Sequence, residues 1–217
     1  MPRPRSLTTR QVAAAALAVI DRDGLPALSM RTAADELGRR TMALYRYVED
    51  REELECLVVD LALGAVLDRA APPTAAPPTA APPTAGPAGP RGRLLALLEL
   101  LREAVGAHPG VLPLAIRHHA GCLPVLRWRE RLLEALAAAG LDGPARAAAL
   151  HALVSYAIGA LEVEHRAAPA DGPGPLVPET FPLLAAALAD RAAADPARAF
   201  TDGARTLLDG LGLGPAD

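Results

Sequence analysis

The stretch SMRTAADELGRRTMALYRYV, residues 29–48, predicts two short helices joined by a turn. Ser29 can begin the first helix, because its hydroxyl accepts a hydrogen bond from an amide of the opening turn that has no partner within the helix. Ala34 is small where the two helices must cross, Gly38 tolerates the positive φ of a tight turn, and Leu44 can anchor the second helix. This spacing predicts a helix-turn-helix.

Basic and aromatic side chains dominate the second of these helices, which we expect at about residues 40–47. Residues 1–48 hold eight arginines against four acids, a local charge of +4 in a chain whose formal net charge is -3. Arginine can grip guanine or phosphate, threonine and alanine methyl groups can touch thymine methyls, and tyrosine hydroxyls bond phosphates. The alternative interpretation is a solvent-exposed polar helix in an ordinary bundle, in which case the turn residues and the local positive charge would occur together only by chance. We therefore predict a surface that binds double-stranded DNA, presented by Thr41, Ala43, Tyr45 and Arg46.

The composition favours an all-α protein. Alanine and leucine dominate, and aromatic residues make up only 3% of the chain, so helix propensity is high outside the Pro and Gly clusters. We predict an N-terminal three-helix helix-turn-helix domain, joined through a long helix to a C-terminal helical bundle. The expected boundaries are 1–70 for the first domain and its connecting helix, 71–90 for a linker, and 91–217 for the bundle.

Two further helices are expected beside the helix-turn-helix. The first begins near Thr8 or Thr9, either of which can cap it, and ends at Gly24. Asp50 caps the connecting helix, which should extend to about residue 70. Each helix has an apolar stripe at helical spacing, formed in the first by Val12, Ala16, Val19 and Ile20 and in the second by Leu54, Leu57, Val58, Leu61 and Val66.

Proline separates this region from the rest of the chain. Three APPTA repeats at 71–85 and the GPAGP that follows cannot continue a helix and offer no apolar face, so we interpret 71–90 as a spacer, with docking of a partner protein as the alternative. Beyond it, Pro or Gly marks each break between the expected helices 91–107, 111–119, 124–139, 144–167, 179–194 and 196–211. The strongly apolar pair 144–167 and 196–211 is either core or the seam of an oligomer.

Other features argue against other classes of protein. Cys56 and Cys122 lie in apolar runs without CxxC spacing, so we interpret both as small buried hydrophobic residues. No serine lies in a GxSxG turn, and the GLGLG run at 210–214 follows a helix, so we expect no enzyme, catalytic residue, metal site or cofactor. No stretch combines about 18 uncharged apolar residues with a membrane-type flank, which predicts a soluble, cytoplasmic protein with no membrane partner.

The run LGRRTMALYRYVEDREEL, residues 37–54, resembles the DNA-binding domain of Tet repressor-type (TetR) transcriptional regulators. That family's pattern is LG, two or three variable residues, a small residue, LY, an aromatic pair, V or F, a polar N-cap and then EEL. The resemblance is close over 7–61 and weaker over 94–211. There, AHPGVLPLA, SYAIGALEVE and LLDGLG are similar to the ligand-binding bundle of the actinobacterial, Tet repressor-like branch.

The resemblance implies roles for individual side chains. It assigns base contacts to Arg31, Thr41, Ala43 and Arg46, and contacts with the DNA backbone to Tyr45, Tyr47 and Arg51. The chain departs from the pattern at Arg39 and Arg40, where the family has an apolar residue followed by Ser or Glu. We expect these two arginines to contact phosphates and to steepen the salt dependence of binding, with Thr41 as the alternative cap of the helix.

The resemblance also implies a homodimer on a palindromic operator, with a small-molecule effector that releases the repressor from DNA. The helices near 144–167 and 196–211 would pack against the same helices of a second protomer and form a four-helix interface. Binding two half-sites related by a dyad multiplies the small affinity of one short helix for DNA. No effector-binding motif of the family matches. The candidates by residue type are His108, His118, Trp128, His151 and Glu162, although a single histidine is more often a surface or core residue. The alternative function is an α-helical small-molecule-binding or enzymatic bundle without DNA binding.

Overall fold

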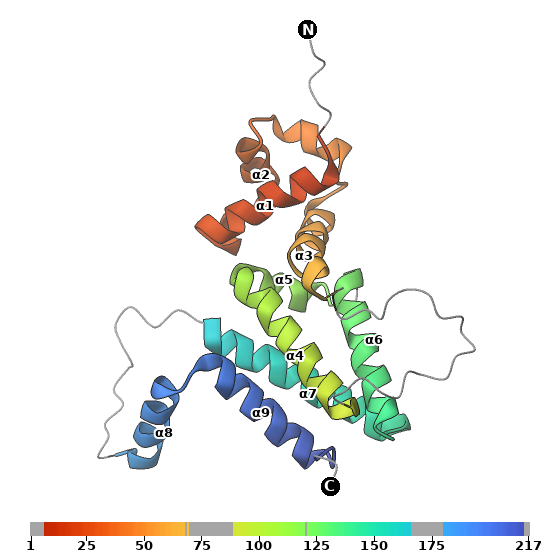
Figure 1. The fold of residues 1–217 in the computed structure, drawn as a ribbon. Helices are drawn as coiled ribbons and strands as arrows, with labels where there is room; N and C mark the ends of the chain where they lie inside the picture. Colours follow the sequence, from red (N-terminus) through yellow and green to blue (C-terminus); the bar gives the residue numbers. More distant parts are fainter. Residues whose placement is uncertain (1–6, 68, 70–88, 120, 166–179, 215–217) are drawn as a thin grey trace, which may run out of the picture.

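The computed structural model describes residues 7–67, 69, 89–119, 121–165 and 180–214 (Figure 1). Within these ranges every regular element is helical, which confirms the all-α class. The expected linker at 71–90 lies outside the described residues, except for Gly89 and Pro90, which open the first helix of the bundle.

The N-terminal part consists of α1 (Thr9–Asp23), η1 (Leu25–Ala27), α2 (Met30–Glu36) and η2 (Thr41–Arg46). Thr8 caps α1 in a reciprocal pair of hydrogen bonds with Gln11, and Gly24 ends the helix with a φ of 82°. Ser29 caps α2 in the same way, together with Thr32. The predicted apolar stripe of α1 is buried, and it packs this helix against α2 and α3.

Helix α3 (Arg51–Leu67) runs from the helix-turn-helix into the bundle (Figure 1). The Asp50 carboxylate accepts a hydrogen bond from the Glu53 backbone N–H at 2.8 Å, and Glu52 and Glu53 lie in the first turn, where the helix dipole favours acids. The helix packs against α1 at one end and against the bundle at the other. Of the predicted stripe, Leu54 and Val58 are buried, whereas Leu57, Leu61 and Val66 are only partly buried. Because the helix is covered from more than one side, its buried face also includes Glu55.

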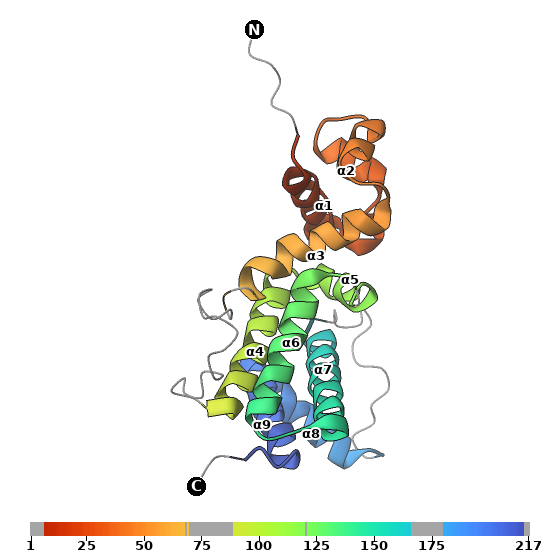
Figure 2. The same cartoon turned by 90° about the vertical axis from the view of Figure 1, so that its right-hand side faces the viewer.

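The bundle follows the predicted order of helices. It contains α4 (Gly89–Ala107), η4 (Pro109–Val111), α5 (Leu112–Arg117), α6 (Leu123–Ala138), α7 (Gly143–His165), α8 (Pro182–Ala193) and α9 (Pro196–Gly210). Helices α4, α6 and α7 pack against one another, and α9 packs against α4 and α7 (Figure 2). The expected helix at 111–119 is instead split into η4 and a short α5, because Pro113 has no N–H to bond the carbonyl of Pro109.

Two helices leave apolar surface uncovered. Helix α7 is long and apolar enough to cross a membrane by length and composition alone. It packs against α4, α6 and α9, however, and a bundle helix can have the same composition. Only 22% of its apolar window is buried, and the described residues of α8 are all at least partly exposed, including Leu183, Leu184 and Leu188. Apolar faces of this extent mark an interaction surface.

Candidate nucleic-acid interface and ligand cavity

A glycine turn and a buried leucine hold the helix-turn-helix together. Gly38 has a φ of 62°, the left-handed region that glycine adopts without strain, and the Arg39 backbone N–H donates to the Ala34 carbonyl at 2.9 Å, which closes the end of α2. Leu44 in η2 is fully buried, as are Ala33 and Ala34 in α2, and the two elements pack against each other. The residues that fix this geometry are the ones predicted from sequence.

The second helix of the pair differs from the expected α-helix. It is a 3₁₀ helix of six residues, in which the Ala43 N–H donates to the Arg40 carbonyl at 2.8 Å; just after it, the Tyr47 N–H donates to the Leu44 carbonyl at 2.8 Å. Arg40 occupies the N-cap position without a side-chain cap, and Thr41 is the first helical residue, so Thr41 does not replace the missing cap. Without a capping side chain, bonds between residues three apart satisfy backbone groups that an α-helix start would leave free.

The candidate DNA-contacting residues fall into two groups by exposure. The exposed group is Arg31, Arg39, Arg40, Tyr45, Arg46 and Arg51, and the partly buried group is Thr41, Ala43 and Tyr47. Tyr47 packs against the hydrophobic core, so part of its ring supports the fold. Met42, which sequence analysis passed over, is 75% exposed in the middle of η2. An apolar side chain this exposed beside Thr41 and Ala43 adds a surface suited to thymine methyl groups.

The N-terminal part also bears arginines whose charges are not neutralised by a nearby acid. Arg22 is not among them, because its guanidinium lies 2.9 Å from the carboxylates of both Asp23 and Glu36. Among the described residues, no hydrogen bond or ion pair involves the side chains of Arg10, Arg39, Arg40 and Arg46. Exposed guanidinium groups of this kind supply the positive potential that attracts a phosphate backbone.

A buried carboxylate ties α3 to the end of α5. The Glu55 side chain is only 3% exposed, and its oxygens lie 2.8 Å from Nε of Arg51, 3.0 Å from Nη1 of Arg117 and 2.7 Å from Nε2 of His118. The two arginines are about half exposed, whereas His118 is buried with Glu55. On the other side of the imidazole, the exposed Glu52 carboxylate lies 3.8 Å from Nδ1. One acid therefore holds three cationic or hydrogen-bonding groups from two separate helices.

The charge state of Glu55 follows from these contacts. Burial alone would raise its pKa, but the hydrogen bonds from His118 and Arg51 and the positive charges of Arg117 and Arg51 outweigh burial and lower it. The carboxylate is thus ionised at neutral pH. Glu55 was not predicted as a functional residue, although its position gave a signal. It follows Leu54 on the apolar side of a helix, where an unpaired carboxylate would be costly.

A second joint connects the N-terminal part to the bundle through η4. Nδ1 of His108 lies 2.8 Å from a carboxylate oxygen of Asp21, near the end of α1. Two residues further on, Gly110 packs so closely on α1 that a Cβ built on it would lie 2.6 Å from Cγ2 of Ile20. Glycine is required here by close approach rather than by backbone conformation.

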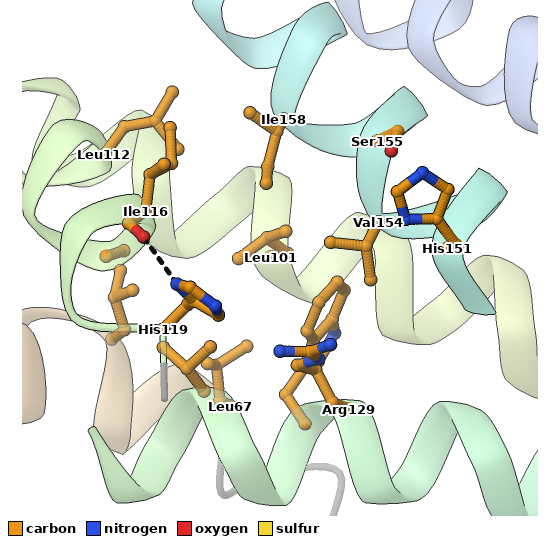
Figure 3. Close-up of a pocket in the computed structure, with 14 residues that line it drawn as sticks. Leu67, Leu101, Leu112, Ile116, His119, Arg129, His151, Val154, Ser155 and Ile158 are labelled. Carbon is orange, nitrogen blue, oxygen red and sulfur yellow. Dashed lines mark hydrogen bonds between the residues drawn. The ribbon is translucent and has the colours of Figure 1, made fainter. Parts of the chain in front are cut away.

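A cavity of about 320 Å³ lies within the bundle, where α3, α4, α5, α6 and α7 all contribute side chains (Figure 3). Most of its wall is apolar and includes Leu67, Leu101, Ile116, Trp128 and Ile158. Nε1 of Trp128 donates to the Leu97 carbonyl at 2.8 Å, which fixes the indole ring in the wall. The volume lies at the lower end of the range of small-molecule sites, about 300–1,000 Å³.

Four polar side chains interrupt the apolar wall, namely His119, Arg129, His151 and Ser155. In Figure 3, His119 and His151 lie at opposite sides of the cavity and Arg129 lies between them. Nδ1 of His119 donates to the Ile116 carbonyl at 2.9 Å, because a carbonyl can only accept. Within the described part of the chain, the Arg129 side chain has no hydrogen-bond or ion-pair partner, and no Asp or Glu lines the cavity.

The structure separates the candidate ligand-binding residues. Trp128 and His151 line the cavity, whereas His108, His118 and Glu162 are not among its lining residues. His108 and His118 instead hold the two joints to the N-terminal part, and Glu162 is exposed on α7. His119, Arg129 and Ser155 were missed by sequence analysis, because they lie on separate elements and belong to no motif.

The two cysteines, Cys56 and Cys122, have no feature of a reactive thiol. Both are free thiols; burial, with a smaller contribution from the neighbouring Cys56, raises the pKa of Cys122 to about 12, so its thiol stays protonated. Among the residues that the structure describes, no group of three or more His, Cys, Asp or Glu side chains is arranged to hold a metal ion.

Known proteins with similar sequences are regulators of transcription. The chain is 32% identical over 160 residues to an HTH-type transcriptional regulator of Saccharopolyspora erythraea, and 31% identical over 162 residues to the HTH-type transcriptional repressor DrrR1 of Streptomyces coeruleorubidus. Each match covers 73% of this chain but only 61% and 54%, respectively, of those proteins, so the chain spans less than two thirds of either. No protein-family model matches the chain.

A solved structure is similar over nearly the whole length of both chains. The crystal structure of a possible TetR family transcriptional regulator from Streptomyces coelicolor A3(2) superimposes with a TM-score of 0.78 at 27% sequence identity, over 94% of this chain and 98% of that one. The helix-turn-helix, the all-helical bundle behind it and these similarities show that the chain resembles Tet repressor-type regulators of transcription in both sequence and fold.

Proposed function

We propose that this protein is a cytoplasmic transcriptional repressor that binds a palindromic operator as a homodimer and leaves it when a small molecule binds the bundle. The observation that carries the proposal is the set of exposed arginines, Arg39, Arg40 and Arg46, that have no ion-pair partner among the described residues, around a helix pair held together by Leu44. Repression, rather than activation, is supported by the similarity to the transcriptional repressor DrrR1.

The DNA contacts follow from residue type and exposure. We assign base edges and thymine methyls to Arg31, Thr41, Met42, Ala43 and Arg46, and phosphates to Arg39, Arg40, Tyr45, Tyr47 and Arg51. Arg51 has a second role, because its Nε is already bonded to Glu55. A phosphate that binds Arg51 would therefore depend on the position of α3 relative to the bundle.

A selection from random duplex DNA tests this proposal directly. The full-length protein should enrich an inverted repeat, and binding to the selected duplex should weaken steeply as salt rises. Arg46→Ala should cost about 1–3 kcal/mol per half-site, the usual value of a specific base contact. Arg127→Ala is the matched control, because Arg127 is an exposed arginine on α6, in the bundle. Equal losses in the two variants would contradict the assignment, and absence of sequence-dependent binding would favour a ligand-binding or enzymatic bundle that does not bind DNA.

The homodimer is supported by the uncovered apolar surface of α7, one of the two helices expected at the interface. Gly159 on α7 is exposed, and a Cβ built on it meets no atom within 4 Å in the protomer. Gly159→Glu should therefore fold normally yet convert the dimer to a monomer, because it would place a charge in the interface. Gly106→Glu on α4 is the control, since Gly106 is equally open. Sedimentation equilibrium distinguishes the two, and a Gly159→Glu variant that remains dimeric would refute this placement of the interface.

The cavity is the proposed effector site. Its wall includes Leu67 from α3 and Ile116 from α5, so a ligand there would touch both helices that meet at Glu55. A ligand releases the repressor only to the extent that it binds the DNA-incompetent arrangement more tightly than the DNA-bound one.

A further inference from the structure

We propose that the cavity selects a hydrophobic organic anion and that Arg129 pairs with its carboxylate or phenolate. The proposal deepens the effector site described above and rests on that proposed function only for its regulatory consequence. Binding itself depends on the chemistry of the wall.

The polar lining of the cavity has one sign of charge. Arg129 is always cationic, His119 and His151 are neutral or cationic, and Ser155 is uncharged. No carboxylate among the lining residues offsets the guanidinium, and among the described residues none pairs with it elsewhere. An organic cation would have to enter against this charge, whereas an anion gains a charge-assisted hydrogen bond.

The position of Arg129 strengthens that preference. Its side chain is only partly exposed and lies beside the apolar wall that Trp128 helps to form, where the effective dielectric is lower than in water (Figure 3). A guanidinium without a partner in such surroundings has lost part of its hydration, and a bound anion restores the missing hydrogen bonds. The same pair on the open surface would contribute little.

The rest of the ligand is set by the apolar wall. Trp128 is fixed by its bond to the Leu97 carbonyl and can stack a flat ring, and leucine and isoleucine side chains cover the other sides. The volume of about 320 Å³ suits a compact ring system rather than a long chain. His151 and Ser155 are exposed at the edge of the cavity, where a second oxygen of the ligand would find a hydrogen bond.

Three probes that share one naphthalene ring test the charge preference by calorimetry. They are the anion 2-naphthoate, its neutral analogue 2-naphthamide and the cation 2-naphthylmethylammonium. The wild-type protein should bind the anion roughly tenfold or more tightly than the amide, and the cation most weakly. Equal binding of acid and amide, a preference for the cation, or binding of none of the three would overturn the inference.

Variants locate the preference at one side chain. Arg129→Gln should abolish the difference between naphthoate and naphthamide while leaving the affinity for the amide within about threefold, whereas Arg129→Lys should keep part of it. Arg127→Gln is the control, since it removes the same charge two residues away on α6, outside the cavity. A preference that survives in Arg129→Gln would refute the role of Arg129, and thermal unfolding of each variant verifies that it is folded.

DNA release is measured separately, by fluorescence anisotropy on a selected duplex. Calorimetry needs no DNA, so naphthoate binding with no DNA binding would overturn the repressor function and leave the ligand class standing. DNA binding by a protein that does not discriminate between acid and amide would do the reverse.

Discussion

Replacing Glu55 with glutamine tests whether the buried ion network joins the helix-turn-helix to the bundle. The substitution keeps the shape of the side chain and one acceptor oxygen, but it removes the charge that faces Arg51, Arg117 and His118. The variant therefore changes electrostatics at the joint with little change in packing. The expected result is a loss of stability without a change of fold.

The magnitude follows from the exposure of each partner. The bond to His118 at 2.7 Å is buried at both ends and contributes about 1.5–3 kcal/mol, as charge-assisted hydrogen bonds do. The two arginines are about half exposed, so each adds only about 0.2–1 kcal/mol. Glutamine retains one acceptor and removes the cost of burying a charge, which offsets part of the loss. We expect Glu55→Gln to lower the free energy of unfolding by about 2 kcal/mol.

Urea denaturation at a fixed protein concentration measures this change, because the stability of the proposed dimer would depend on concentration. A loss of this size shifts the midpoint by about 1 M for an m-value near 2 kcal/mol/M. Glu52→Gln is the matched control: Glu52 is 78% exposed and lies 3.8 Å from the same imidazole, so we expect a loss of about 0.5 kcal/mol or less. If the two variants lose the same stability, the buried network does not stabilise the joint.

The difference in stability between the wild-type protein and Glu55→Gln should also depend on pH. The pKa of Glu55 is lowered in the folded protein, so its ionised form stabilises the fold at neutral pH. This contribution is present above about 4.3, the pKa of an unfolded glutamate, and is lost as the pH falls through the lower, folded-state pKa. The difference in stability between wild type and Glu55→Gln should therefore narrow between pH 5.5 and pH 3.5. A difference that widens over that range would mean that the folded protein raises the pKa of this carboxyl.

Two close-packed glycines give the remaining predictions. Gly203→Ala places a Cβ 2.3 Å from the hydroxyl of Tyr156, so it should disturb the contact between α7 and α9 and destabilise the protein by about 1–3 kcal/mol in urea. Gly110→Ala should cost a similar amount, because its Cβ would lie 2.6 Å from the buried Ile20 and push α1 away from η4. Gly106→Ala is the control: its added Cβ meets no atom within 4 Å, so the substitution should be neutral or stabilising by up to about 1 kcal/mol. If Gly106→Ala lowers the free energy of unfolding as much as the other two variants do, general effects on helix stability, and not these contacts, explain the result.

The helix-turn-helix was predictable because short-range chemistry determines it. Ser29 caps, Gly38 turns and Leu44 anchors, and each does so through its own side chain or backbone conformation. The form of the second helix was not predictable from the same pattern. Whether residues 41–46 form an α-helix or a 3₁₀ helix depends on how the missing cap is compensated, and Arg40 does not supply one.

The polar residues of the bundle could not be paired from sequence, because their partners lie far away in the chain. His118 and Glu55 are 63 residues apart, and His108 and Asp21 are 87 apart. Residue type alone suggested a ligand-binding role for both histidines, yet each is used to join the bundle to the N-terminal part. The cavity residue Arg129 has no neighbouring motif, and only the packing of α6 against α7 brings it into the same cavity as His151.

The segment from His108 to His118 lies between the cavity and the helices that pack against the helix-turn-helix. At its start, His108 and Gly110 contact α1, and at its end His118 holds Glu55 on α3. Between these two joints, Leu112 and Ile116 form part of the cavity wall. A ligand that displaces this segment would push it against α1 and α3, the two helices that pack beside the helix-turn-helix. Displacement of α7 alone would reach neither joint directly. The coupling between cavity and DNA surface should therefore be lost when either joint is broken, with ligand affinity itself unchanged.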